Sequence, residues 1–170
     1  MSGEAGKYAR FELERRFLLE RLPRGTNTER GWLITDRYIH NTRLRPRRME
    51  PLGGGDPVYK LGQKEAPSPP DFSRMTITNI YLSPNEYEVF AALAADELRK
   101  RRHVLRYDDR DYTVDVFEGR HAGLILAEVG FETDAEMKAH TLPPFALRDV
   151  SRESRFTGGE LAKRGSSSST

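Results

Sequence analysis

Three charged residues near the start of the sequence stand at alternate positions. Glu12, Glu14 and Arg16 are two positions apart, so on a β-strand their side chains point to the same face. Carboxylates at this spacing can share a hard divalent cation such as Mg²⁺ or Mn²⁺, which prefers oxygen ligands. The pattern also fits a solvent-exposed strand face on which Arg16 pairs with a glutamate, because alternation alone does not identify the buried face.

Basic pairs with the same even spacing recur later in the chain. They are Arg43 and Arg45, Lys60 and Lys64, and Lys100 and Arg102. Three such pairs together with an acidic pair indicate a charged sheet surface on which the signs are sorted. If that surface closes on itself, like charges meet in its interior, which is unfavourable unless a ligand with many negative charges is bound. A triphosphate with a metal ion meets both needs, because Arg and Lys bind phosphate oxygens and glutamates hold the cation.

Short strands are the main elements that would position these residues. Period-two alternation predicts about seven strands, with expected ranges 11–19, 37–45, 58–64, 75–82, 99–107, 112–117 and 123–131. Two of the later strands carry Asp115 and Glu128. The segments 46–57 and 66–71 are rich in Pro and Gly and are expected to be loops.

One helix has clear start signals. Ser83 is an N-cap residue, Pro84 follows at the first helical position, and Glu86 stands at the capping-box position. The residues that follow predict a helix that runs to about Leu98. Weaker capping boxes begin at Thr133 and Thr157 and predict short helices at best. The sequence therefore predicts an α+β fold with a largely antiparallel sheet.

Composition limits the size of the fold and the classes of partner. The chain has 170 residues, which fits one domain over 1–170, and we expect residues 1–7 and 165–170 to be disordered. With 28 Lys and Arg against 26 Asp and Glu, the balanced charge argues against nonspecific binding to nucleic acid. There is no cysteine, residues 1–7 lack the apolar stretch of a signal peptide, and no apolar run is near the ~20 residues that cross a bilayer. We expect a cytoplasmic protein with neither a membrane nor a nucleic-acid partner, and the sequence predicts no oligomeric state.

The order of these motifs resembles the CYTH superfamily, the triphosphate tunnel metalloenzymes. The first motif of that family is E-x-E-x-K, and this chain has E-L-E-R-R at 12–16, with Arg in place of Lys. Similar segments follow in order: T-R-L-R at 42–45, Y-K-L at 59–61, K-x-R at 100–102, Y-T-V-D-V-F at 112–117, G-L-I-L-A-E-V at 123–129 and D-V-S-R-E-S-R-F at 149–156. The resemblance covers nearly the whole chain.

The resemblance implies a closed antiparallel eight-stranded β-barrel, a tunnel with a few flanking helices, and a small triphosphate as substrate. Mg²⁺ or Mn²⁺ would bind to Glu12, Glu14 and Glu128, and these three with Arg16 would be the catalytic residues. The substrate would bind to Arg43, Arg45, Lys60, Lys64, Lys100, Arg102 and Arg155. Asp115, Asp149 and Glu153 would be second-rank members of the site. A water molecule activated by the metal or a carboxylate would attack the terminal phosphorus.

Departures from the family pattern leave more than one function open. Gly130 stands where the family usually has the second acid of a late E-x-E, and the neutral segment T-I-T-N-I-Y at 76–81 stands where it often has several glutamates. Metal-dependent hydrolysis of a triphosphate, such as inorganic tripolyphosphate or a small organic triphosphate, is the first hypothesis. A weakly active or non-catalytic module that binds triphosphate, polyphosphate or nucleotide is the second. A class IV-type adenylate cyclase is the third hypothesis. It ranks last because K-Y-A-R at 7–10 lacks the His-Phe pair of those enzymes.

Overall fold

The computed structural model of this protein describes residues 7–163. Three helices in this range are α1 (Pro84–Ala91), α2 (Asp134–Ala139) and α3 (Gly158–Lys163), and two short 3-10 turns are η1 (Gly119–His121) and η2 (Ser154–Phe156). No helix in the described range is long and apolar enough to cross a membrane. The strands are β1 (Arg10–Leu19), β2 (Trp32–Ile39), β3 (Leu44–Pro51), β4 (Val58–Glu65), β5 (Arg74–Leu82), β6 (Ala95–Tyr107), β7 (Arg110–Phe117), β8 (Ile125–Phe131) and β9 (Arg148–Asp149).

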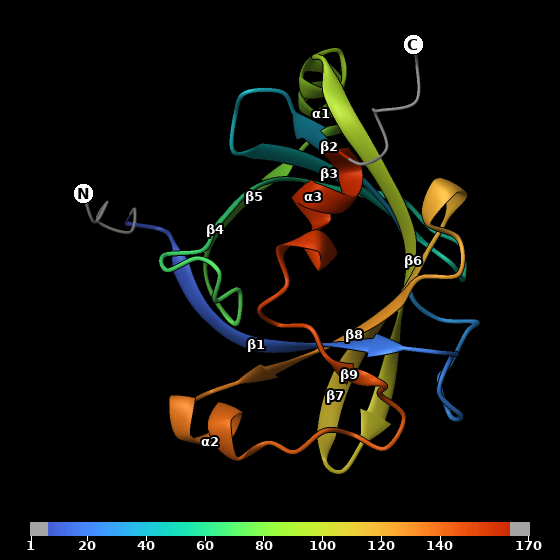
Figure 1. Cartoon of the computed structure of the whole chain (residues 1–170). Helices are drawn as coiled ribbons and strands as arrows, with labels where there is room; N and C mark the ends of the chain where they lie inside the picture. The colour runs from blue at the N-terminus through green and yellow to red at the C-terminus, as the bar shows by residue number, and fades with distance from the viewer. Residues whose placement is uncertain (1–6, 164–170) are drawn as a thin grey trace.

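Eight antiparallel strands close into a barrel (Figure 1). Their order is β5-β4-β3-β2-β6-β7-β8-β1, and pairing of β1 with β5 completes the ring. The short β9 pairs with β1 over two residues outside this ring. The predicted α+β barrel is confirmed. The disorder expected at the ends concerns residues that, apart from Lys7, lie outside the described range.

The range 37–45, expected to be one strand, contains a turn. β2 ends at Ile39, and Asn41 adopts a left-handed φ of 59°, which Asn tolerates well. The Thr42 hydroxyl donates to the Ile39 carbonyl at 3.0 Å and stabilises the reversal. The expected loop at 46–57 is correspondingly shorter, because residues 44–51 form β3 between β2 and β4.

Helix α1 begins as predicted but ends at Ala91 rather than at Leu98. Ser83 and Glu86 form the expected capping box. The segment 91–95 reads A-A-L-A-A, which favours helix and contains neither Gly nor Pro. From Ala95 onward, however, the chain pairs with β2. Closure of the barrel thus overrides the local helical preference.

Apolar packing is divided between the outside of the barrel and one end of its interior. Phe17, Tyr112 and Val114 belong to an outer cluster that also contacts Phe145, in the segment after α2. A second cluster joins residues of the inner face to the C-terminal segment, and its buried members are Leu98, Phe117, Leu126, Val150, Leu161 and Ala162. Figure 1 shows α3 within the outline of the ring. The C-terminal segment therefore fills one end of the tunnel.

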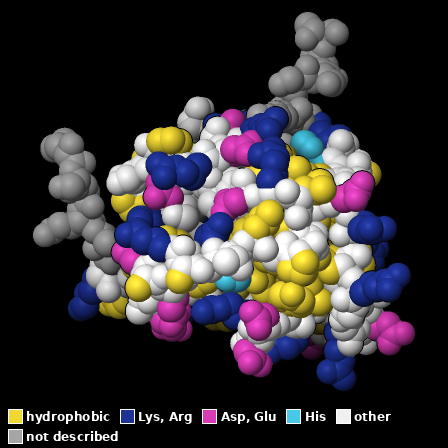
Figure 2. Space-filling model, turned by 60° about the horizontal axis from the view of Figure 1, so that its bottom comes forward, with side chains coloured by type: hydrophobic (Ala, Val, Ile, Leu, Met, Phe, Trp, Pro, Cys, Tyr) yellow, Lys and Arg dark blue, Asp and Glu magenta, His cyan; other side chains and the backbone are white. Residues whose placement is uncertain are grey.

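Part of the outer apolar layer reaches the surface. Figure 2 shows hydrophobic side chains gathered on the face that comes forward from the bottom of Figure 1, with charged side chains around them. Leu142 and Leu147, which follow α2, are each about half exposed. The barrel thus places much of its apolar packing outside and leaves a large part of its inside to polar residues.

Candidate functional site: a charged tunnel

The interior of the barrel contains a cavity of about 1040 Å³. Nine Arg and Lys residues and six Asp and Glu residues line it. The basic ones are Arg16, Arg43, Arg45, Arg47, Lys60, Lys64, Lys100, Arg102 and Lys163, and the acidic ones are Glu12, Glu14, Asp96, Asp111, Asp115 and Glu128. The evenly spaced charges of separate strands thus converge on one cavity, and the alternative of an exposed strand face does not hold.

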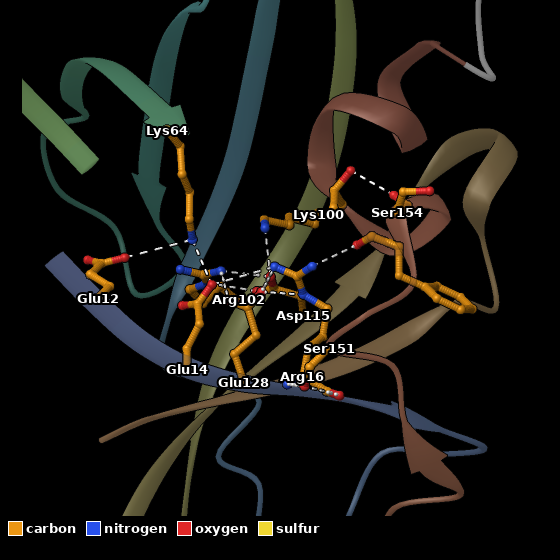
Figure 3. A network of polar contacts seen from close by, with 12 residues as sticks. Glu12, Glu14, Arg16, Lys64, Lys100, Arg102, Asp115, Glu128, Ser151 and Ser154 are labelled. Carbon is orange, nitrogen blue, oxygen red and sulfur yellow. Dashed lines mark hydrogen bonds and ion pairs between the residues drawn. The ribbon is translucent and has the colours of Figure 1, made fainter. Parts of the chain in front are cut away.

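Arg16 lies beside Glu128 on the acidic side of the tunnel (Figure 3). It stands opposite Glu128 in the pairing of β1 with β8. Its Nε and Nη2 atoms each lie 2.7 Å from Glu128 Oε1, and Nη2 lies 3.6 Å from Glu14 Oε1. Burial opposes the charge of Arg16, whose side chain is 10% exposed, but Glu128 and Glu14 outweigh burial and raise its pKa.

Lys64 of β4 reaches past β5 to the glutamates of β1. Its Nζ donates to Glu14 Oε1 at 2.7 Å and lies 3.7 Å from Glu12 Oε2. Glu12 is the most open of the three predicted metal ligands, with 41% of its side chain exposed. Between these strands, β5 presents Met75 and Ile77 to the cavity, so it offers no carboxylate there.

Asp115 of β7 neutralises two cations of β6. Arg102 Nε and Nη2 donate to Asp115 Oδ1 and Oδ2, each at 2.7 Å, and Lys100 Nζ donates to Oδ2 at 2.6 Å. Lys100 is 7% exposed, and burial lowers its pKa to about 8 although Asp115 opposes this shift. Burial favours the neutral form of Asp115, but Arg102 and Lys100 outweigh it and lower the pKa of this carboxyl.

The sequence did not predict a further acid–base group on β2 and β3. Asp36 is 1% exposed and accepts from Arg47 Nε at 2.6 Å and Nη2 at 2.8 Å, while Arg45 Nε lies 3.6 Å away. Burial disfavours the charge of Asp36, but these two arginines lower its pKa far below the usual range. Arg47 continues the even spacing of Arg43 and Arg45, which was the available signal, but Pro46 indicated a loop. Asp36 lies in a strand that the sequence analysis did not identify.

Arg45 and Lys60 have no carboxylate at hydrogen-bonding distance among the described residues. Arg45 Nε is buried and has no hydrogen-bond partner among the residues that the structure describes. A Cβ at Gly62 would lie 3.2 Å from Arg45 Nη2 and 2.7 Å from Asn79 Oδ1, so the glycine leaves room for the guanidinium. Lys60 forms no ion pair within the described range, and its Nζ lies 5.0 Å from the centre of the Tyr81 ring.

Three residues predicted for the site do not line the cavity. Asp149 pairs with Arg15 at 2.6 Å, on the opposite face of β1 from Arg16, and Arg155 Nη2 pairs with Glu153 at 2.8 Å. Because β9 pairs with β1 over only two residues, the segment after it leaves the sheet. In that segment, alternate positions no longer point into the tunnel, which explains the positions of Glu153 and Arg155.

The carboxylates as placed do not fit the metal site expected from the sequence. Within residues 7–163, no three Asp, Glu or His side chains come together in a way that could hold a metal ion. Glu14 and Glu128 flank the guanidinium of Arg16, and Glu12 lies near Lys64. An Mg²⁺ or Mn²⁺ site needs several oxygen atoms directed to one point. Glu12, Glu14 and Glu128 do not supply that arrangement.

Several solved structures share this fold. Two crystal structures of the protein NE1496 each align with 89% of this chain at a TM-score of 0.58. The first, described as a hypothetical protein, is aligned over 97% of its length at 20% identity. The second, described as an inorganic triphosphatase, is aligned over 93% of its length at 21% identity. PH1819 from Pyrococcus horikoshii OT3 aligns over 75% of this chain and 82% of its own, with 18% identity and a TM-score of 0.53. The putative adenylate cyclase bh2851 from Bacillus halodurans aligns over 77% and 86%, with 13% identity and a TM-score of 0.53. No protein-family model and no curated protein sequence matches this chain.

Proposed function

We propose that this chain, which has the fold of the CYTH tunnel proteins, binds a small triphosphate inside its tunnel and hydrolyses it. The observation that carries the proposal is the convergence of cations from β1, β3, β4 and β6 on one cavity, where nine Arg and Lys residues outnumber six Asp and Glu residues. Charge-assisted hydrogen bonds from such cations suit phosphate oxygens. The description of NE1496 as an inorganic triphosphatase supports the proposal through the shared fold.

The chemistry of phosphoryl transfer suits this set of residues. The transition state is loose, so catalysis depends mainly on positioning the phosphate and stabilising its charge. Arg45 and Lys60, which have no carboxylate at hydrogen-bonding distance among the described residues, are the cations that we expect to contact phosphate oxygens. Glu128 stays ionised, because Arg16 and Lys64 outweigh its burial and hold its pKa well below the usual range. An ionised carboxylate can accept a hydrogen bond from the attacking water and orient it.

Binding with little turnover is a second candidate, and the ion pairs favour it. Glu14 and Glu128 are both engaged by Arg16. The cavity also receives Ile77 and Asn79 from β5 and Gly130 from β8, none of which carries a carboxylate. Mg²⁺ or Mn²⁺, expected from the sequence, would find few free protein oxygens there.

Two measurements test these candidates, and the first of them separates the two. Release of phosphate from tripolyphosphate, with and without Mg²⁺ or Mn²⁺, is expected for a hydrolase and not for a binding module. Thermal stabilisation by tripolyphosphate is expected for both, because a ligand that binds only the folded state stabilises it. Absence of both signals would reject the proposal.

A matched pair of variants tests whether release occurs in the tunnel. Glu128→Gln is expected to abolish phosphate release and to retain tripolyphosphate binding, because it removes the charge that orients the water. Glu153→Gln makes the same change outside the cavity, so release is expected to stay at the wild-type rate. Equal loss in both variants would place the reaction elsewhere.

A further inference from the structure

We infer that the guanidinium of Arg16 replaces a protein-bound divalent cation on the acidic side of the tunnel, so that a triphosphate binds there without a metal ion. The inference rests on the proposed function and specifies how the same cavity balances its charge. It concerns Arg16 itself, which stands at the position of Lys in the E-x-E-x-K motif of the family that this chain resembles.

The guanidinium of Arg16 is held at several points. Nε and Nη2 contact Glu128, Nη2 also faces Glu14, and Nη1 donates to the Phe156 carbonyl at 3.3 Å. Arginine presents its donors in a rigid planar fork, whereas lysine carries a compact charge on a flexible stem. Arg16 therefore bridges the two carboxylates from a position fixed by a third contact.

The backbone of Arg16 is fixed as well. Its N–H donates to Ser151 Oγ at 2.9 Å, and its carbonyl accepts from the Val150 N–H at 2.8 Å. Figure 3 shows Arg16 next to Glu128, with Glu14 beyond Glu128 and Ser151 beside Arg16. Movement of Arg16 out of this position would break contacts to β8 and to the C-terminal segment together.

A metal ion would have to compete with this guanidinium for the same oxygens. Repulsion between a divalent cation and a buried guanidinium at ion-pair distance is strong. Expelling Arg16 instead would leave a buried charge without its partners, which is also strongly unfavourable. Both routes make protein-bound metal less favourable than the existing ion pairs.

Further cations surround the same carboxylates. Lys64 Nζ lies 2.7 Å from Glu14 Oε1, and Arg102 Nη2 lies 3.5 Å from Glu128 Oε2. Glu128 therefore meets cations at both of its oxygens. The acidic side of the tunnel is neutralised from β1, β4 and β6 by the chain's own residues.

Wild-type protein gives the first test. Mn²⁺ titrated into metal-free protein, with free Mn²⁺ followed by electron paramagnetic resonance, is expected to show no saturable binding. In calorimetry, tripolyphosphate is expected to bind in EDTA at least as tightly as in excess MgCl₂, because Mg²⁺ cancels part of the charge of the ligand. Saturable Mn²⁺ binding, or tripolyphosphate binding that Mg²⁺ strengthens by about tenfold or more, would overturn the inference.

The outcomes distinguish this inference from the proposed function. Lack of tripolyphosphate binding in both buffers would reject the proposed function, whereas binding that requires Mg²⁺ would support that function and reject the inference. The Mn²⁺ titration decides the role of Arg16 in either case, since it needs no triphosphate.

Two neighbouring arginines provide matched variants. Arg16→Gln removes the guanidinium that Glu14 and Glu128 share and is expected to bind Mn²⁺ at least about tenfold more tightly than any binding detectable in wild type. Arg15→Gln removes the same charge from the opposite face and frees only Asp149, so its Mn²⁺ binding is expected to match wild type. A folded Arg16→Gln variant, judged by its circular dichroism, that gains no Mn²⁺ binding would contradict the inference. If that variant does not fold, the wild-type titrations still decide it.

Discussion

The two sides of the tunnel balance their charges in different ways. On the side formed by β1, β6, β7 and β8, the carboxylates and cations engage one another at 2.6–2.7 Å. We call Arg16, Lys100, Arg102, Asp115 and Glu128 the paired side. On β3 and β4, Arg47 and Lys64 are paired as closely, at 2.6 and 2.7 Å, but Arg45 lies 3.6 Å from its nearest acid and Lys60 Nζ lies 5.0 Å from the centre of the Tyr81 ring. We call Arg45 and Lys60 the open side.

This difference separates the residues that hold the barrel together from those available to a ligand. A buried ion pair adds little net stability, but removing one partner leaves an uncompensated charge at high cost. An incompletely neutralised cation lacks that interdependence and can donate to an incoming phosphate oxygen. Substitutions on the paired side should therefore act mainly on stability, and at Glu128 also on turnover, whereas substitutions on the open side should act mainly on affinity.

The largest expected effect is on the paired side. Asp115→Asn leaves Lys100 and Arg102 buried without their shared carboxylate. We expect the free energy of unfolding, measured by urea denaturation, to fall by about 3–5 kcal/mol. Tripolyphosphate should stabilise this variant more than wild type, because it supplies negative charge to the two cations.

Lys60→Gln on the open side is the control for that variant. Lys60 has no ion pair among the described residues, so its loss should change the free energy of unfolding by less than about 0.5 kcal/mol. The same variant should bind tripolyphosphate more weakly than wild type. Comparable destabilisation by Asp115→Asn and Lys60→Gln would show that the two sides do not differ in the way described.

Arg45→Ala tests the affinity of the open side. Loss of its charged hydrogen bonds, at about 1.5–3 kcal/mol, should weaken tripolyphosphate binding by about 10- to 100-fold in calorimetry. Stability should fall less than in Asp115→Asn, because Asp36 keeps its two hydrogen bonds from Arg47. Arg48→Ala, on the other face of β3, removes an arginine paired with the partly exposed Glu50 and should leave affinity unchanged. An equal loss in both variants would mean that bulk charge, rather than the tunnel, determines binding.

Local alternation was enough to predict which charges of β1, β4 and β6 share a face. Side chains two positions apart share a face whatever the rest of the fold does, so Glu14 and Arg16, or Lys100 and Arg102, could be grouped from the sequence. The barrel itself was predicted only as seven strands from alternation, and eight from the resemblance. Alternation merged the end of β2 and the start of β3 into the single range 37–45 and missed the rest of β2, where the charged Asp36 is buried inside the barrel.

The pairing of charges could not be predicted, because it depends on strand order and register. Arg16 stands opposite Glu128 only because β1 pairs with β8, and Arg102 stands opposite Asp115 through the pairing of β6 with β7. These are long-range contacts that leave no local pattern. The resemblance likewise suggested that Arg155 belongs to the site, but the chain leaves the sheet after β9. Residues could be assigned to the tunnel from sequence, but their partners could not.

The dependence of affinity on pH gives the smallest and most specific test. Burial lowers the pKa of Lys100 to about 8, and a bound polyanion would favour its charged form. Binding should therefore take up a proton above that pH, and tripolyphosphate affinity should fall by up to about tenfold between pH 8 and 9 and level off below pH 8. The stability of the unliganded protein should change with pH in the direction opposite to that of the tripolyphosphate affinity. The unfolded chain binds the Lys100 proton more tightly, so this residue alone makes stability rise with pH above about 8.

Lys100→Arg is the matched control for this profile, because arginine stays charged throughout this range. Titration of tripolyphosphate itself is common to both proteins, so only the difference between their calorimetric profiles reports on Lys100. A steeper decline of affinity with pH in wild type than in Lys100→Arg would show that a paired-side cation also contacts the ligand. The two sides would then differ only in how strongly they contact it. Parallel profiles would confine ligand binding to the open side and make the separation between the two sides complete.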